Sequence, residues 1–190
     1  MSIFRRGGEK HEIAVAMAGV KLGDRLLHIG CTNPSLLAAI SSKVGLSGQA
    51  CAIVSSDADA ARAQRGAESG GVLLEIEKMS NLDTFPHDSE SFDLIVLDNQ
   101  GGLLSNMRPD ERVACLKQAF RTLAPRGRII LIERSPRPGL AALFSKGAAI
   151  DPRYQASGGA LASLKAEGFK AVRQLATREG MSFFEGVRER

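Results

Sequence analysis

The stretch LKAEGFKAVRQLATREGMSFFEGVR, residues 164–188, carries the most informative pattern in this chain. It contains two strand-like runs, Phe169–Ala176 and Met181–Val187, with only Thr177–Gly180 between them. Parallel neighbours need a crossover of roughly a dozen residues or more, so these two runs are expected to pair antiparallel. The chain is therefore predicted to end in a β-hairpin.

Upstream of this hairpin, strand-like and helix-like stretches alternate. The predicted strands are Arg25–Gly30, Ala50–Val54, Val72–Glu77, Phe92–Leu97 and Arg128–Glu133, and the predicted helices are Glu9–Val20, Pro34–Val44, a segment from Ser56 to Gly70, one that begins at Pro109, and Gly158–Glu167. Such alternation is typical of parallel strands joined by helices. We therefore expect an α/β fold in which residues 1–190 form a single domain, with an N-terminal helix in residues 1–20 and the core in residues 21–190.

The composition is that of an ordinary globular protein. Of the 190 residues, 44% are hydrophobic and 24% are charged, and no apolar run reaches the length that spans a bilayer, about 20 residues. Charged residues and no apolar segment follow Arg5 and Arg6, so we expect a cytoplasmic protein without a signal peptide or membrane insertion. A single Tyr and no Trp leave little for base stacking, which argues against a nucleic-acid partner despite the net charge of +4.

The cysteines and the common catalytic motifs indicate no site. Cys31, Cys51 and Cys115 are an odd number without a C-x-x-C spacing, so we expect buried thiols and neither a disulfide framework nor a metal site. The sequence has no Ser-His-Asp signature, no H-E-x-x-H and no Walker lysine. The remaining candidates lie at the ends of the predicted strands.

Several stretches in register resemble the class I S-adenosylmethionine-dependent methyltransferases, and among them the ubiquinone/menaquinone-biosynthesis type. VKLGDRLLHIGC at 20–31 is similar to that family's first strand, SFDLIVLD at 91–98 to its fourth, AFRTLAPRGRIILIE at 119–133 to a helix and the fifth strand, and the terminal hairpin to its last two strands. The resemblance implies a Rossmann-like methyltransferase fold, with a seven-stranded, mostly parallel sheet and an antiparallel last strand. It also implies S-adenosyl-L-methionine as the cofactor.

This chain departs from that family at the acidic residues that hold the cofactor. The family has an acid on strand one near the cofactor's ammonium, one at the end of strand two for the ribose and one after strand three for the adenine. His28, Val54 and Lys78 stand at these positions here. Of the family's G-x-G-x-G only Gly30 is kept, since threonine and proline replace the other two glycines. Losing three charged acceptors, at about 1.5–3 kcal/mol each, would weaken binding by several orders of magnitude.

The resemblance still assigns a set of residues to the cofactor. They are His28, Gly30, Cys31, Thr32, Asn33, Ser55, Asp57, Met79, Asp98 and Asn99. Asp98 is also the candidate catalytic residue, because the family positions its methyl acceptor beside the end of strand four. Asn33 or Thr32 can cap the helix that starts at Pro34, whose backbone N–H groups suit the methionine carboxylate.

Each of these candidates also has a structural interpretation. Gly30 can serve a tight turn from strand to helix, and His28 can be a half-buried core histidine. Asp57 can complement the dipole of the helix that it opens. Asp98 can cap a loop at the end of its strand.

Functions of different classes follow from these observations. The first is a methyltransferase for an unidentified small-molecule acceptor, and basic residues after strand five would suit an anionic one: Arg134, Arg137, Lys146 and Arg153. The second is a non-catalytic, methyltransferase-like module that binds a protein partner, which the lost acidic positions favour. A nicotinamide-dependent reductase is a third, but it requires G-x-G-x-x-G and a parallel sixth strand with no seventh strand beside it.

Overall fold

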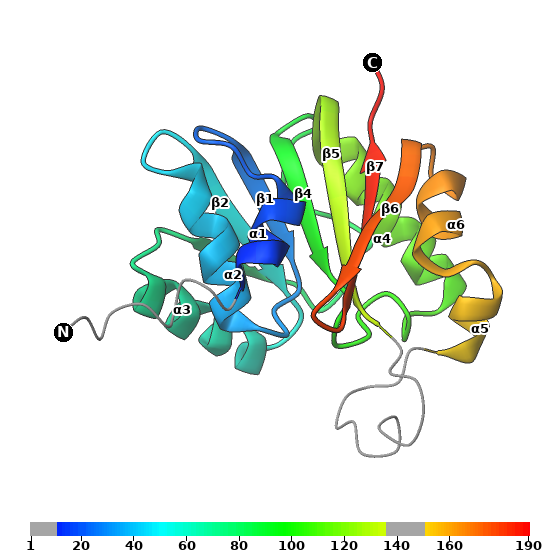
Figure 1. Cartoon of the computed structure of the whole chain (residues 1–190), viewed down its shortest axis with the longest axis horizontal. Coiled ribbons are helices and arrows are strands. Elements are labelled where there is room, and N and C mark those ends of the chain that lie inside the picture. The colour runs from blue at the N-terminus through cyan, green and yellow to red at the C-terminus, as the bar shows by residue number, and fades with distance from the viewer. Residues whose placement is uncertain (1–10, 136–150) are drawn as a thin grey trace.

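A computed structural model of the chain describes residues 11–135 and 151–190. The strands form one sheet in the order β3-β2-β1-β4-β5-β7-β6 (Figure 1). Their bounds are Arg25–Ile29 (β1), Gln49–Val54 (β2), Glu75–Lys78 (β3), Phe92–Asp98 (β4), Leu123–Arg134 (β5), Lys170–Arg178 (β6) and Met181–Val187 (β7). Only β7 runs antiparallel to its neighbours, β5 and β6. The predicted seven-stranded sheet with its antiparallel last strand is confirmed.

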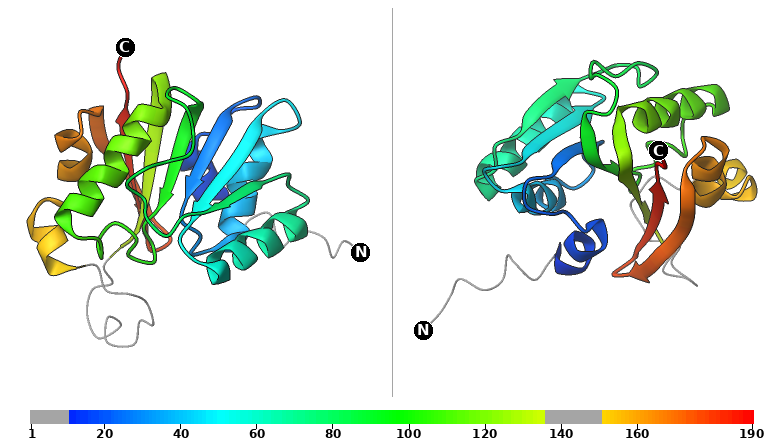
Figure 2. Two further views of the ribbon diagram at one scale, coloured as in Figure 1. Left: turned by 180° about the vertical axis from the view of Figure 1, so that it is seen from behind. Right: turned by 90° about the horizontal axis from the view of Figure 1, so that it is seen from above.

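Helices cover both faces of this sheet. They are α1 (Glu12–Ala18), α2 (Pro34–Ser41) with the short 3-10 turn η2 (Ser42–Val44), α3 (Asp57–Gly70), α4 (Pro109–Thr122), α5 (Pro152–Ala156) and α6 (Gly159–Ala166). Figure 2 shows α1, α2 and α3 on one face and α4, α5 and α6 on the other. Buried strand residues therefore divide between two core layers: Leu26 packs with α1 and α2, and Leu27 and Ile29 pack with α4.

The fifth strand starts earlier than the sequence predicts. The sequence predicts a strand only from Arg128, after turn-like residues at Ala124–Gly127, yet β5 already begins at Leu123, which pairs with Phe92. The register then shifts before Leu94 pairs with Arg128, so the residues between form a bulge inside the strand. Turn-like residues at a bulge and at a loop look alike in sequence, which explains the difference.

Two other elements begin later than the sequence predicts, and one helix was not predicted. β3 begins at Glu75 and not at Val72, because its pairing with β2 starts where Glu75 lies opposite Cys51. α1 begins at Glu12, and residues 9 and 10 of the predicted helix lie outside the described residues. α5 was not predicted.

A buried carboxylate ties the antiparallel strand to its surroundings. Glu185 on β7 accepts hydrogen bonds from Arg128 Nη1 at 3.3 Å and from Arg173 Nε at 3.0 Å. Arg128 also donates to the Gly19 carbonyl at 2.8 Å, just after α1. One carboxylate therefore joins β5, β6, β7 and the end of α1, and the two arginines compensate its charge.

Candidate cofactor site

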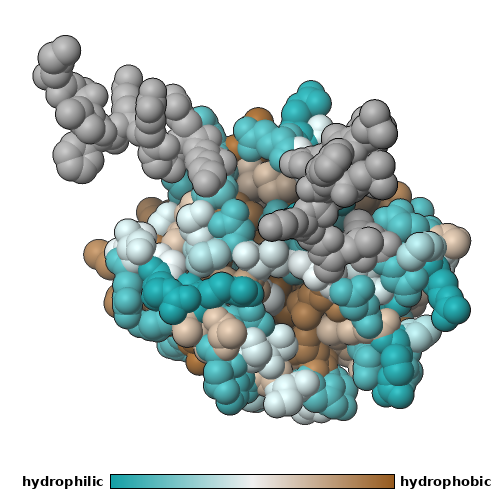
Figure 3. All heavy atoms as spheres, turned by 90° about the horizontal axis from the view of Figure 1, so that it is seen from below, coloured by the Kyte–Doolittle hydropathy of each residue, from teal (hydrophilic) through white to brown (hydrophobic). Residues whose placement is uncertain are grey.

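The carboxyl ends of β1 and β4 lie side by side at the lower edge of the sheet in Figure 1. The chain order reverses between these two strands, and in open α/β sheets such a switch point is where ligands bind. Half-buried apolar residues of the loops after β3 and β4 pack on the core: Met79, Leu103 and Met107. Figure 3 looks onto this edge and shows apolar side chains in a recess between polar ones.

Gly30 makes the tight turn at the end of β1. Its φ is +86°, and its N–H donates to the Ile53 carbonyl at 2.8 Å. A Cβ at this position would lie 3.0 Å from the Asp98 carbonyl oxygen and 3.1 Å from Leu103 Cδ2. The predicted strand-to-helix turn is confirmed, and the loops after β1 and β4 are in contact across it.

Substitution of Gly30 is expected to be costly for two separable reasons. Gly71 is a matched control, because its φ is +63° and a Cβ there meets nothing within 4 Å. We expect Gly71→Ala to lower the free energy of unfolding by about 1 kcal/mol through backbone strain alone. Gly30→Ala adds overpacking and should cost about 2–4 kcal/mol in denaturant titrations. Equal costs for the two variants would contradict the contact between the loops.

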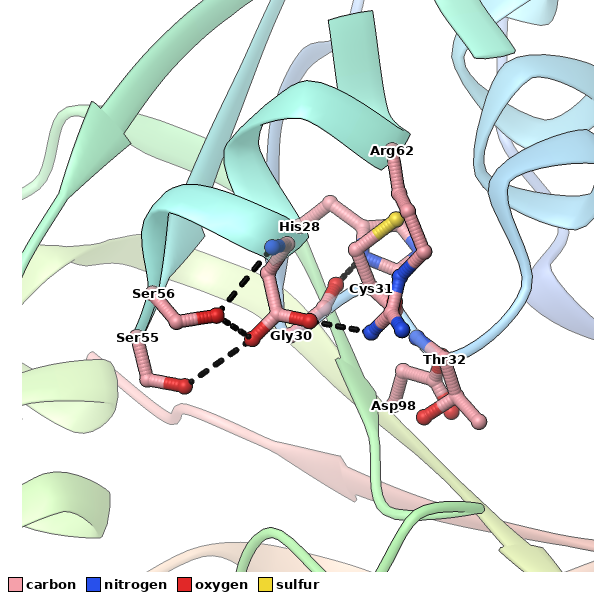
Figure 4. Close-up of polar contacts among 9 residues, drawn as sticks. His28, Gly30, Cys31, Thr32, Ser55, Ser56, Arg62 and Asp98 are labelled. Atoms are coloured by element: carbon pink, nitrogen blue, oxygen red, sulfur yellow. Dashed lines mark hydrogen bonds and ion pairs between the residues drawn. The ribbon is translucent and has the colours of Figure 1, made fainter. Parts of the chain in front are cut away.

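Asp98 is the best-defined polar residue of the site. It is only 1% exposed, and its Oδ2 accepts the Thr32 N–H at 2.8 Å (Figure 4). Its Oδ1 accepts the backbone N–H and the side-chain amide of Gln100 at 3.1 and 3.2 Å. No ion pair to Asp98 occurs within residues 11–135 and 151–190. Asp98 therefore holds two loops together and leaves a negative charge beside the Gly30 turn.

The helix that follows this turn is capped by its own side chains. Asn33 Oδ1 accepts the N–H groups of Ser35 and Leu36, both at 3.2 Å, so Asn33 and not Thr32 is the cap. Thr32 instead donates its amide to Asp98. These bonds use amides that the first turn of α2 would otherwise offer to a carboxylate.

His28 is fully buried on β1 and is bonded at one ring nitrogen. Nδ1 donates to the Gly30 carbonyl at 2.9 Å, which requires the proton to be on Nδ1. Nε2 is buried without a partner among the described residues. Burial lowers the pKa of His28, and the nearby charge of Asp98 opposes this only in part. The side chain is therefore neutral at pH 7.

A neutral buried histidine makes stability depend on pH. The unfolded chain takes up a proton near pH 6.5, whereas folded His28 takes it up only at lower pH. The free energy of unfolding should therefore fall as the pH drops from 7 to 5, by at most about 1.4 kcal/mol per pH unit for this group. His28→Gln should have a shallower dependence in denaturant titrations across that range. Parallel curves for the two proteins would show that His28 is not the group responsible.

The end of β2 has no carboxylate free for a ribose. Val54 is buried, and the hydroxyls of Ser55 and Ser56 both donate to Asp59 Oδ2, at 3.2 and 2.8 Å (Figure 4). Asp59 also pairs with Arg62, which donates to the Cys31 carbonyl at 3.1 Å. This cross-link between α3 and the loop after β1 was not predicted, although Asp59 and Arg62 have the i,i+3 spacing of a helical ion pair.

The other predicted cofactor residues lie around the same edge. Asp57 is exposed and pairs with Lys78 Nζ at 2.7 Å, so the two charges cancel. Met79 donates its N–H to the Val54 carbonyl at 2.8 Å. Cys31 is buried, and burial raises the pKa of its thiol to about 11, so it is protonated at pH 7.

Asn99 belongs to a buried network that the sequence did not reveal. Its Oδ1 accepts the Leu104 N–H at 2.7 Å, and its Nδ2 donates to Glu133 Oε1 at 2.9 Å. Tyr154 on α5 donates to the same oxygen at 2.6 Å, and the guanidinium carbon of Arg112 lies 4.6 Å from the centre of the tyrosine ring. Burial and Glu133 raise the pKa of Tyr154, which keeps the hydroxyl protonated. The network fixes α5 against the ends of β4 and β5.

Solved structures of other proteins share this architecture. The chain aligns over 98% of its length, and over 93% of the other chain, with a SAM-dependent methyltransferase from Aquifex aeolicus, at a TM-score of 0.71 and 16% identity. It also aligns over 96% of its length with 65% of a SAM-dependent O-methyltransferase from Thermotoga maritima, at a TM-score of 0.64 and 13% identity. With the cyclase SpnF, the alignment covers 96% of this chain and 80% of the other, at a TM-score of 0.68 and 15% identity.

The fold is that of the class I methyltransferases. No protein-family model and no curated protein matches the sequence, so the similarity is one of structure. The ubiquinone/menaquinone-biosynthesis subtype stays a prediction. The reductase alternative is wrong in its architecture, because β7 lies beside the sixth strand and separates it from β5.

The described residues hold neither a metal site nor a membrane-spanning helix. No group of three His, Cys, Asp or Glu side chains within 11–135 and 151–190 has the arrangement of a metal site. In the same residues, no helix has the length and apolar character needed to cross a bilayer.

Proposed function

We propose that this chain is an S-adenosylmethionine-dependent methyltransferase that acts on a small-molecule acceptor. The observation that carries the proposal is the buried carboxylate of Asp98, which has no cationic partner among the described residues and lies beside the Gly30 turn. A buried charge favours a ligand of opposite sign. S-adenosylmethionine carries positive charge on both its sulfonium and its ammonium group.

The residues fit the two halves of this cofactor unequally. Asp98 and the turn after β1 suit the cationic methionine end. The nucleoside end meets buried Val54, and the hydroxyls of Ser55 and Ser56 are already bonded to Asp59. We therefore expect the methionine end to supply most of the affinity, and the ribose to bind through a hydroxyl or backbone group that changes partner.

In methyl transfer, the main task of the protein is to align the acceptor with the methyl group. Bound S-adenosylmethionine supplies a methyl group that is already activated. The chain has to hold the acceptor in line, within roughly 3–3.5 Å, and to exclude water. Both Asp98 oxygens accept N–H bonds, so Asp98 is better suited to hold charge than to take a proton. Arg134 at the end of β5 and Arg153 on α5 would favour an anionic acceptor, whereas Arg137 and Lys146 lie outside the described residues.

Calorimetric titration with S-adenosylhomocysteine tests this function. We expect a single site with a dissociation constant in the micromolar range. Thiol reagents should not alter this dissociation constant, because the three cysteines are buried. Metal chelators should not alter it either, because the described residues hold no group that could bind a metal ion. Absence of heat at millimolar ligand would contradict the proposal.

A non-catalytic, methyltransferase-like module is the second candidate. The structure favours it at one point, because no carboxylate stands at any of the family's three acidic positions. His28 donates to its own loop, Val54 is apolar and Lys78 is paired with Asp57. The cyclase SpnF shares the fold, so the fold alone does not fix the reaction.

A further inference from the structure

We infer that the amino-terminal edge of the sheet is a contact surface for a second copy of this chain. In the residues that the structure describes, the exposed large hydrophobic side chains are Leu22 (78%), Leu46 (98%), Leu73 (85%) and Val113 (38%). The first three lie in the connections that lead into β1, β2 and β3. We call Leu22, Leu46 and Leu73 the leucine patch.

The fold brings the leucine patch together. β3, β2 and β1 are consecutive neighbours in the sheet, at about 4.8 Å between strands, so the residues that precede them share one end. The Gly23 N–H donates to the Val44 carbonyl at 2.9 Å, and a Cβ at Gly45 would collide with Leu22. The first two connections are therefore bonded to each other, and Figure 1 shows them side by side.

A groove lies within this surface. Its volume is about 500 Å³, and it is lined by apolar and polar residues that include Ser42, Val44, Leu46, Gln49, Leu73 and Leu74. It is at the opposite end of the strands from the Gly30 turn and Asp98. The proposed cofactor site therefore does not account for it. Contiguous exposed apolar side chains of this kind mark contact sites.

The charges around the leucine patch favour a second copy over other partners. Lys21 stands beside Leu22 at the β1 end of the row, and Glu75 stands near Leu73 at the β3 end; both are exposed. A two-fold axis near Leu46 would place Lys21 of each copy opposite Glu75 of the other, because an isologous contact exchanges the two ends. A nucleic acid or an anionic membrane would require a surface of one sign.

The neighbouring Asp24 does not pair with the Lys21 side chain. Asp24 is half-buried, and its Oδ2 accepts the Lys21 backbone N–H at 2.8 Å, which closes the turn into β1. The ammonium of Lys21 has no ion pair among the described residues. Glu75 accepts from Gln49 at 3.2 Å and likewise has no cationic partner among the described residues. Each end therefore keeps a charge for the other copy.

Sedimentation velocity of the full chain from low to high micromolar concentration tests the inference. We expect a reversible dimer, and the double variant Leu46→Asp with Leu73→Asp should raise the dissociation constant at least tenfold. Val113→Asp is the control, since it places an aspartate at an exposed apolar residue of α4 outside the leucine patch, and it should leave the dimer unchanged. Both leucines are highly exposed, so the melting temperatures of the variants should stay close to that of the parent.

Charge reversal tests the two-fold arrangement separately. Lys21→Glu alone and Glu75→Lys alone should each weaken the dimer several-fold, and the combined variant should restore it. A parent protein that stays monomeric, a dimer that survives the double aspartate variant, or a combined variant that restores nothing would each overturn the inference. None of these readouts depends on cofactor binding.

Discussion

The Asp98→Asn variant is expected to bind S-adenosylmethionine about 10- to 100-fold more weakly than the parent protein. Asparagine keeps an oxygen for the Thr32 N–H but removes the buried charge. A charge-assisted contact is worth about 1.5–3 kcal/mol, and about 1.4 kcal/mol corresponds to a factor of ten. S-adenosylhomocysteine lacks the sulfonium charge, so its affinity should fall less. Calorimetric titration of both ligands measures the difference.

Asp110→Asn is the control for this variant. Asp110 lies in the first turn of α4, where its charge is exposed and paired with Arg108, in contrast to the buried charge of Asp98. It should bind both ligands as the parent does. If Asp98→Asn stays folded and binds S-adenosylmethionine with the parent's affinity, the charge of Asp98 has no part in cofactor binding and its role is to hold the loops.

The Glu185→Ala variant is expected to lose about 3 kcal/mol of folding free energy. The carboxylate side chain is only 7% exposed, and its removal leaves Arg128 without its acidic partner at the junction of β5, β7 and α1. Removing one member of a buried ion pair costs far more than the pair contributes, because the remaining charge stays desolvated. Urea titration of the variant measures the loss.

An exposed ion pair provides the comparison. In the Arg108–Asp110 pair both side chains are more than 70% exposed, so Asp110→Ala should cost less than about 1 kcal/mol. A small loss for Glu185→Ala, similar to that of the control, would contradict the view that this carboxylate secures the antiparallel strand.

The architecture could be predicted because its main signals are local. The short Thr177–Gly180 connection allows only an antiparallel pair, and the same pairing is observed between β6 and β7. The alternation of strand-like and helix-like stretches upstream predicted the parallel strands of the sheet. The errors fall where pairing partners set the boundary: β5 extends to Leu123 because Phe92 pairs with it, and β3 starts only where it meets β2.

For the candidate site, the sequence predicted which residues lie at the strand ends but not which contacts they make. Gly30 and Asp98 lie where strand ends were expected, since the carboxyl ends of parallel strands share one edge. The Asp59–Arg62 cross-link to Cys31 and the Glu133–Tyr154 bond depend on which side chains meet in three dimensions. The periodicity of the sequence does not indicate such tertiary contacts between side chains, so only the structure reveals them.

The most direct test of the proposed cofactor site is an amide chemical-shift titration of the full chain with S-adenosylhomocysteine. The largest changes should be at Gly30, Thr32 and Asn99, at the carboxyl ends of β1 and β4. The amides of Leu46 and Leu73, at the opposite end of the strands, should not move. Shifts confined to other parts of the chain, or none at millimolar ligand, would contradict a cofactor site over the Gly30 turn.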